Sequence, residues 1–321
     1  MGDVIRFLRW VSRLFKRNGG PLAGLMVLGL LLSLATPHFF TASNLRNVAQ
    51  QASINAIVSI GMTFVIITAG IDLSVGSVLA LVGVVLASLL HAGWSLPPAV
   101  GIALAGGFGC GAVNGALVCW GRLPPFIVTL GMMSMARGGA LVYTGGRPIS
   151  GFEEPFRILA QGTWLSLPIP VWIMIGLYLA AHAVLTRTSL GRYTYAIGGN
   201  ETAVRLSGVN VHAYKTLIYG LSGFTAAAAA VLLTARLNSA SPLAGINYEL
   251  DAIAATVIGG TSLMGGEGSI AGTLIGAFII QVLRNGLNLL NITSNFQNIV
   301  IGAVIVAAAL LDTYLKSRRK S

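Results

Sequence analysis

The segment NLRNVAQQASINAIVSIGMTFVIITAGIDLSVGSVLAL occupies residues 44–81 and contains two apolar runs separated by a short polar stretch. The first run covers residues 53–69, and the second begins at residue 74 and continues to residue 91. The stretch between them, TAGIDLSVGS (68–77), holds glycines, hydroxyls and one carboxylate. A membrane-spanning helix needs roughly 20 mostly apolar residues. The pattern therefore predicts two membrane helices joined by a break.

The composition extends this interpretation to the whole chain. Of its 321 residues, 55% are hydrophobic and only 9% are charged, with a mean hydropathy of +0.81. Soluble domains carry about 25% charged residues, so this chain cannot cover a water-facing surface. A membrane β-barrel would show segments of about ten alternating residues, which are absent. We therefore predict an all-α polytopic membrane protein, whose 41 glycines suit helices that pack backbone to backbone.

Apolar runs of sufficient length predict about ten transmembrane helices, some of them short or broken. They form a single transmembrane domain over residues 1–321, with no room for a separate soluble domain. The N-terminus resembles a signal peptide, but it lacks a convincing cleavage site and reads as an uncleaved first span. The candidate spans are 21–37, 53–69, 74–91, 97–119, 125–144, 168–186, 214–235, 249–263, 269–290 and 296–312.

The basic residues predict which side of the membrane each loop faces. The net charge is +11, but most of the 20 Lys and Arg residues fall in segments that ten crossings place on one side. Under the positive-inside rule both termini are then cytoplasmic, as segments 1–20 and 313–321, together with the loop 187–213. A nucleic-acid partner is not needed to explain the charge. The two terminal clusters are Arg6, Arg9, Arg13, Lys16 and Arg17, and Lys316, Arg318, Arg319 and Lys320.

No catalytic pattern is found in the sequence. A phosphate-binding P-loop needs a lysine after a glycine, and none of the four lysines follows one. We therefore predict no enzyme activity, no cofactor and no metal site in this chain, and any ATP must be bound by a partner. Cys110 and Cys119 share one apolar run and predict no disulfide. The carboxylates lie at span ends or breaks, which disfavours an ion-driven carrier without excluding one.

Two breaks are candidates for a translocation path. TAGIDLSVGS (68–77) and GGTSLMGGEGS (259–269) both combine glycines, a hydroxyl and an acid, and both end in Gly-Ser. Broken helices at membrane depth free backbone groups that can meet a polar solute. Tight cytoplasmic turns remain the alternative. The candidate path residues are Gly70, Asp72 and Ser74, with Glu249 and Asp251 near the outer mouth. Arg137 and Arg284 could add a polar path or subunit contact, or could simply be paired at helix ends.

The polar stretch AIGGNETAVRLSGVNVHAYK (196–215) lies between two apolar runs and reads as a short cytoplasmic helix. Asn200 is a suitable N-cap, and Glu201 and Arg205 form an i,i+4 pair in the favoured order. Gly208 suits the helix stop, and Asn210 can cap the next helix. The helix is either part of an ordinary solvated loop or a docking element that transmits a partner's movement to the two flanking spans.

Three motifs together resemble the permeases of bacterial sugar ABC importers of the ribose, xylose and galactoside type. They are residues 44–81, GRYTYAIGGNETAVRLSGVNV (191–211) and YELDAIAATVIGGTSLMGGEGSIAGTLIGA (248–277). The similarity runs in order over about residues 22–313, and ribose-transporting members resemble the chain most. These motifs are specific to the family and much less specific to the sugar.

The resemblance implies an inner-membrane importer that works by alternating access. Two permease chains, expected to be identical, would form the pathway. Separate cassette ATPases would bind ATP and Mg, and a periplasmic or lipid-anchored binding protein would deliver a monosaccharide. A branched-chain amino acid, nucleoside or autoinducer furanose permease and an ion-driven carrier remain alternatives. The implied ATPase-coupling residues are Gly198, Gly199, Asn200, Glu201, Ala203, Arg205, Leu206, Ser207 and Gly208.

Overall fold

The computed structural model describes the backbone of residues 2–320 and the side chains of residues 19–308 and 310. This part of the chain forms twelve helices and four two-residue strands. The helices are α1 (Gly2–Ala35), α2 (Ala42–Ile67), α3 (Val75–His91), α4 (Leu96–Cys119), α5 (Pro125–Thr144), α6 (Glu154–Gln161), α7 (Ile169–Arg187), α8 (Ser189–Leu206), α9 (Val211–Leu237), α10 (Tyr248–Ile258), α11 (Ile270–Leu289) and α12 (Ser294–Lys320). The strands are β1 (Ile149–Ser150), β2 (Thr163–Trp164), β3 (Leu167–Pro168) and β4 (Ser239–Ala240).

Within the described residues, six helices are long and apolar enough to cross a membrane, namely α2, α4, α5, α7, α9 and α11. Three shorter apolar helical segments, Gly19–Ala35, Val75–His91 and Ser294–Ala308, match three further predicted runs. The prediction of a helical, multi-pass membrane protein is therefore confirmed. The basic clusters at the two chain ends lie outside the residues whose side chains are described, so the cytoplasmic location of both termini stays a prediction.

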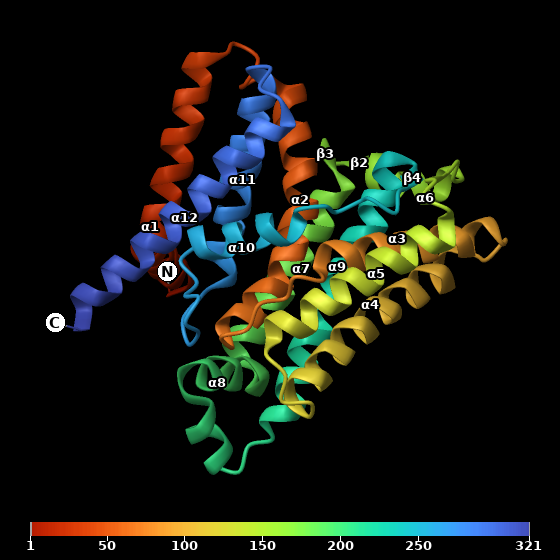
Figure 1. Ribbon diagram of the computed structural model, residues 1–321. Helices are drawn as coiled ribbons and strands as arrows, with labels where there is room; N and C mark the ends of the chain where they lie inside the picture. The colour runs from red at the N-terminus through yellow and green to blue at the C-terminus, as the bar shows by residue number, and fades with distance from the viewer. Residues whose placement is uncertain (1, 321) are drawn as a thin grey trace.

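The count of ten full spans is not confirmed, because α10 has only 11 residues. At 1.5 Å per residue it extends about 16 Å, roughly half of the hydrocarbon thickness of a bilayer. The predicted span 249–263 ends early because Gly259 and Gly260 stop the helix, with Gly260 at a φ of +88°. In Figure 1, α10 lies at mid-height, and the chain returns upward from it through α11.

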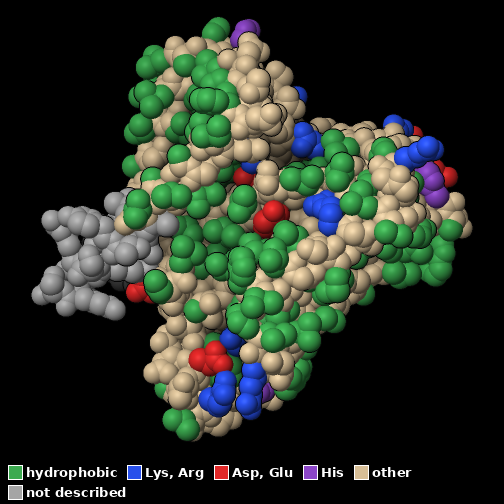
Figure 2. Space-filling model, in the orientation of Figure 1, with side chains coloured by type: hydrophobic (Ala, Val, Ile, Leu, Met, Phe, Trp, Pro, Cys, Tyr) green, Lys and Arg blue, Asp and Glu red, His purple; other side chains and the backbone are tan. Residues whose placement is uncertain are grey.

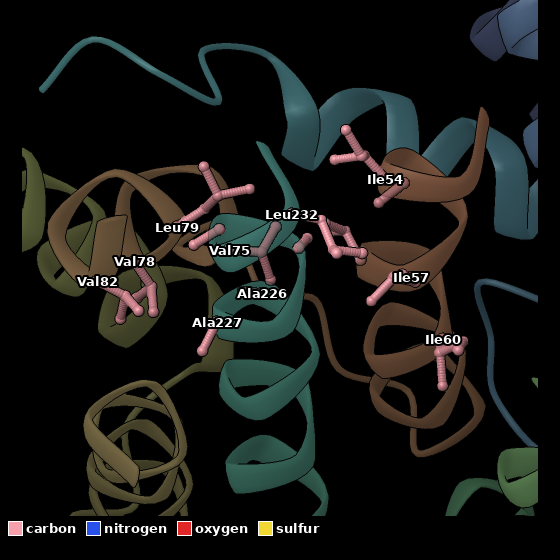
Figure 3. Packing of buried hydrophobic residues seen from close by; sticks show 14 of the residues in the cluster. Ile54, Ile57, Ile60, Val75, Val78, Leu79, Val82, Ala226, Ala227 and Leu232 are labelled. Atoms are coloured by element: carbon pink, nitrogen blue, oxygen red, sulfur yellow. The ribbon is translucent and has the colours of Figure 1, made fainter. Parts of the chain in front are cut away.

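The main core is built around α9. Figure 3 shows α9 between α2 and α3, with Ile57 of α2 and Val75 of α3 directed toward Ala226 and Leu232 of α9. These side chains are almost fully buried. The run of alanines in α9 keeps the helix thin, so that larger apolar side chains of its neighbours can pack on it closely.

α4 packs against α9 through glycines spaced four residues apart. A Cβ added to Gly107 would lie 2.6 Å from the carbonyl oxygen of Gly223, and one added to Gly115 would lie 2.5 Å from the Cα of Thr216. Gly111, between them, touches the backbone of Tyr219 in the same way. Small residues at this spacing allow the backbones of membrane helices to approach. The high glycine content thus serves the packing that the composition predicted.

A second, smaller cluster joins α1 to α2 and α11 through Leu32, Phe39, Val48 and Val282. Alongside it, α2 and α11 are bonded by matching polar pairs along their length. These are Asn44 with Asn285 (2.8 and 3.0 Å), Gln51 with Gln281 (3.0 Å) and Thr63 with Thr273 (2.8 Å). The pairs fix the register of these antiparallel helices, because each needs its partner at the same depth.

The connection between the predicted spans 125–144 and 168–186 is not a plain loop. It contains β1, the short helix α6 and the β2–β3 hairpin, which correct the purely helical expectation. β1 pairs antiparallel with β4, and the amide of Phe152 donates to Oδ1 of Asn238 at 2.9 Å. Figure 1 shows these elements at the upper right of the molecule, whereas α8 lies at its lower end.

Candidate functional site

Residues 198–208, here called the α8 arm, contain a kink at Asn200, the helical turns that follow it up to Leu206, and the turn at the end of α8. Asn200 has non-helical dihedrals (φ −162°, ψ 93°), and its Oδ1 accepts from the amide of Ala203 at 2.9 Å. The arm ends at Gly208, where φ is +82°. Asn210 then accepts from the amide of Ala213 at 3.1 Å and caps α9. The predicted caps and stop are confirmed, while the residues before the kink, 189–199, are helical as well.

Glu201 forms ion pairs with two basic residues, one on the arm and one on α9. Its carboxylate accepts from Arg205 at 2.7 Å, as predicted, and also from Nζ of Lys215 at 3.0 Å. Partial burial alone would raise the pKa of Glu201, but the hydrogen bond and charge of Lys215, followed by those of Arg205, lower it below its usual value. Figure 2 shows acidic and basic side chains gathered over α8, at the lower end of a mostly uncharged surface.

Gly198 lies where the arm meets both sequence breaks. A Cβ added to it would overlap the carbonyl oxygen of Ile67, the last residue of α2, and would lie 2.5 Å from the amide nitrogen of Gly266. The amide of Gly266 in turn donates to Ile67 O at 2.8 Å. Tyr195 adds a bond from its hydroxyl to Gly268 O at 2.8 Å. The two breaks and α8 are therefore in direct backbone contact.

The first break is closed by a buried polar network around Asp72. Ser74 donates to the Asp72 carboxylate through its hydroxyl (2.6 Å) and its amide (3.0 Å), and the Ser222 hydroxyl donates to the other oxygen at 2.8 Å. Asn114 donates to the Ser74 hydroxyl at 3.0 Å. Gly70 allows the close approach of the Tyr219 hydroxyl. The network ties the break to α4 and α9, and Asp72 and Ser74 are each 1% exposed in this conformation.

The other two candidate path residues lie on α10. Asp251 is buried and accepts two hydrogen bonds from Arg284, at 2.7 and 3.1 Å. Glu249 is half-buried, and its carboxylate lies close to Gly76 in the first turn of α3. Arg137 donates from Nη1 to the carbonyls of Pro242 (2.6 Å) and Ala244 (2.7 Å), holding the loop that leads into α10. Both arginines are thus engaged at helix ends or loops.

Sequence reasoning did not identify which residues pair across distant parts of the chain. Lys215 and Ser222 complete the groups around Glu201 and Asp72. Arg284, for which pairing at a helix end was one alternative, is paired with Asp251. Asn114 carried a signal in the sequence, because an amide inside an otherwise apolar run needs a buried partner, and it is bonded to Ser74. In the part of the chain that the structure describes, no cluster of three or more His, Cys, Asp or Glu could hold a metal, and both cysteines are free thiols.

Comparisons with known proteins place this geometry in context. Residues 44–309 match a family described as the permease component of branched-chain amino acid transport systems. The chain is 50% identical to the ribose import permease protein RbsC of Escherichia coli K12, over 95% of this chain and 96% of that protein. It is 46% identical to RbsC of Bacillus subtilis 168 (91% and 92%) and 39% identical to the D-allose transport system permease protein AlsC of E. coli K12 (89% and 88%). No solved structure matches.

Proposed function

The chain belongs to this family of transport-system permeases, and on that premise we propose that it is the membrane-spanning subunit of an ATP-binding-cassette importer for a monosaccharide. Ribose is the cargo that we favour, because relatives named as ribose import permeases are 46–50% identical over nearly the whole chain. Relatives named for allose and arabinose are 39% and 35% identical. The protein would lie in the cytoplasmic (inner) membrane, with both termini and the α8 arm on the cytoplasmic side.

A separate ATPase would power the transport. None of the four lysines follows a glycine, so the chain offers no P-loop of its own, and ATP and Mg would be held by the partner. A second copy of the permease would complete the pathway, and a periplasmic or lipid-anchored binding protein would deliver the sugar. These partners follow from the type of transporter, and the arm supplies the surface on which the ATPase would dock.

The observation that carries the mechanism is the backbone contact of Gly198 with Ile67 and Gly266. An ATPase that moves the arm would move Gly198, and with it the end of α2 and the loop 259–269. Both breaks would shift together because the amide of Gly266 is bonded to Ile67 O. This would open or close a path past Gly70, Asp72 and Ser74 on one side and Glu249 and Asp251 on the other.

The transport function is tested by reconstituting the chain in vesicles with its ATPase and binding protein and measuring uptake of labelled ribose. We expect uptake that requires both ATP and the binding protein. Uptake of another sugar but not ribose, under the same requirements, would correct the cargo. Uptake that ignores ATP and stops with a protonophore would overturn the proposal in favour of an ion-driven carrier.

The coupling step is tested with two adjacent glycines of the same arm. Gly198→Ala places a methyl group against Ile67 O and Gly266 N, and overpacking of this kind costs about 1–3 kcal/mol. We expect ribose uptake to fall by about tenfold, which corresponds to a loss of about 1.4 kcal/mol in the coupling free energy between the arm and the two breaks. Gly199→Ala is the matched control, because a Cβ there meets no atom within 4 Å.

Comparable amounts of folded protein for both variants, judged by gel filtration and thermal unfolding, separate a coupling defect from misfolding. If Gly198→Ala and Gly199→Ala transport ribose equally well, the contact does not couple the arm to the breaks.

A further inference from the structure

A cavity of about 370 Å³ lies between the α8 arm and the ends of α4, α5 and α9. Its walls carry three cationic side chains, those of Arg122, Arg205 and Lys215, against the single carboxylate of Glu201, and His212 also lines it. Small-molecule sites in proteins occupy about 300–1,000 Å³. The cavity is therefore large enough for a small anionic group, and the charge on its walls favours one.

The positive charge of this cavity is not balanced within the described part of the chain. Glu201 is already bonded to both Arg205 and Lys215, and Arg122 forms no ion pair among the described residues. Arg122 also has a φ of +52°, a left-handed conformation that glycine adopts more readily. Non-glycine residues in this conformation cluster at binding and active sites, and Arg122 lines the cavity.

One border of the cavity faces the apolar surface of the molecule. Leu123 lines the cavity, and its neighbours Trp120, Phe126 and Ile127 are 63%, 56% and 58% exposed. α4 and α5 bury only 39% and 28% of their most apolar windows, so much of their remaining surface is available to lipid. Trp120 packs edge-on against His212 (centroids 6.2 Å apart), and tryptophan is enriched at the membrane–water interface.

We propose that this cavity binds the phosphate of an anionic membrane lipid, whose acyl chains lie along the exposed faces of α4 and α5. The guanidinium of Arg122 offers a planar set of donors that suits a phosphate, and Lys215 and Arg205 add charge behind it. Basic pockets at the cytoplasmic ends of membrane helices bind such headgroups. The cytoplasmic location rests on the orientation given under the proposed function, while the cavity and its charges do not.

A lipid in this cavity would connect the α8 arm to the bilayer. Glu201 and Arg205 belong to the arm and also line the cavity, whereas Arg122 belongs to the turn between α4 and α5. A phosphate between Arg122 and Arg205 would hold these two elements together. The position of the arm would then depend on the anionic lipid content of the membrane.

The test is native mass spectrometry of the purified full-length chain in detergent with equal amounts of phosphatidylglycerol and phosphatidylcholine. We expect selective retention of phosphatidylglycerol, and Arg122→Gln should lower it about fivefold, as expected for one basic side chain near an anionic headgroup. Arg122→Lys should retain most of the binding. Arg192→Gln removes an exposed charge of α8 that does not line the cavity, and it should leave retention unchanged.

Equal retention of the two lipids, or equal losses in the Arg122→Gln and Arg192→Gln variants, would overturn the proposal. Displacement of phosphatidylglycerol by low millimolar inorganic phosphate would show a soluble-anion site and overturn the lipid assignment. Because the readout is binding by the isolated chain, it can fail while ATP-dependent ribose uptake succeeds, and the reverse also holds. The two proposals are therefore tested separately.

Discussion

Asp251 and Asp72 are both buried carboxylates in helices or breaks of the membrane domain, yet they are satisfied in different ways. Asp251 is 3% exposed and accepts two hydrogen bonds from the cationic side chain of Arg284. Asp72 is 1% exposed and accepts only from uncharged donors, which are the hydroxyl and amide of Ser74 and the hydroxyl of Ser222. The first arrangement joins α10 to α11, and the second joins the α2–α3 break to α9.

The two carboxylates therefore depend on different properties of their partners, charge in one case and hydrogen-bond geometry in the other. The ion pair needs both charges, because either one alone would be left uncompensated in a medium of low dielectric constant. The hydroxyl network needs acceptor geometry, and each hydroxyl can rotate to accept instead of donating. Loss of a charge in the α10–α11 contact should therefore destabilise the folded protein. At the α2–α3 break, the folded protein should instead be destabilised by loss of the side chain's shape and of its acceptor oxygen.

The largest effect is expected for Asp251→Asn. The substitution keeps the size of the side chain but leaves the charge of Arg284 without its partner, and breaking one member of a buried ion pair costs about 3–5 kcal/mol. We expect a marked fall in the thermal unfolding midpoint of the purified protein in detergent. The measurement is a thermal scan of the variant against the unsubstituted chain.

A double-mutant cycle sharpens this prediction. Asp251→Asn combined with Arg284→Gln removes both charges, so the pair should be less destabilised than the sum of the single variants by about 1–3 kcal/mol. Strict additivity would mean that the two side chains act independently and that the ion pair is not what holds α10 on α11.

A smaller effect is expected at Asp72, and it should depend on the replacement. Asp72→Asn retains an oxygen for Ser74, while Ser222 can rotate to accept from the new amide, so we expect a loss below about 1 kcal/mol. Asp72→Ala leaves both serines without an acceptor and should cost about 2–3 kcal/mol. Thermal unfolding of the two variants measures how their losses of stability compare. Equal losses would show that the charge of Asp72 matters in itself and would remove the contrast with Asp251.

The features that could be predicted from the sequence are local ones. Asn200, Gly208 and Asn210 determine helix ends through bonds to residues three positions away or through their own dihedrals. The pair of Glu201 and Arg205 follows from one helical turn. Hydropathy likewise predicted nine of the apolar helices, because the apolar residues that are buried in lipid or protein form a continuous run in each of them.

The features that were missed depend on tertiary structure. Arg284 was left between a polar path and a pair at a helix end, and its partner Asp251 lies 33 positions away. Ser222 lies 150 positions from Asp72, in a run of small residues that gives no hint of a bond. The short α10 was read as a span because residues 250–258 are mostly apolar, and the predicted span was extended to residue 263, past Gly259, where the helix ends. The contact of Gly198 with the two breaks could not be predicted, because the sequence shows only a glycine at this position and not the backbone that it meets.

The smallest effect is expected for a third carboxylate, Glu201, which lies at the solvent-facing arm and has a side chain that is 36% exposed. Its ion pairs with Lys215 and Arg205 should contribute less than about 1 kcal/mol to stability, because solvent and salt screen them. Since the pairs lower the pKa of Glu201 in the folded state, their contribution is present above the unfolded value near 4.5 and is lost as the pH falls through the folded value.

The difference in unfolding midpoint between the unsubstituted chain and Glu201→Gln should therefore be constant from pH 7 to pH 6 and should shrink as the pH approaches 4. Arg192→Gln, which lies outside this cluster, should show a difference that does not change over the same range. A Glu201→Gln difference that grows toward acid pH would have the opposite sign to the expected one. It would mean that the folded state disfavours the carboxylate, and that Lys215 and Arg205 do not outweigh the cost of its partial burial.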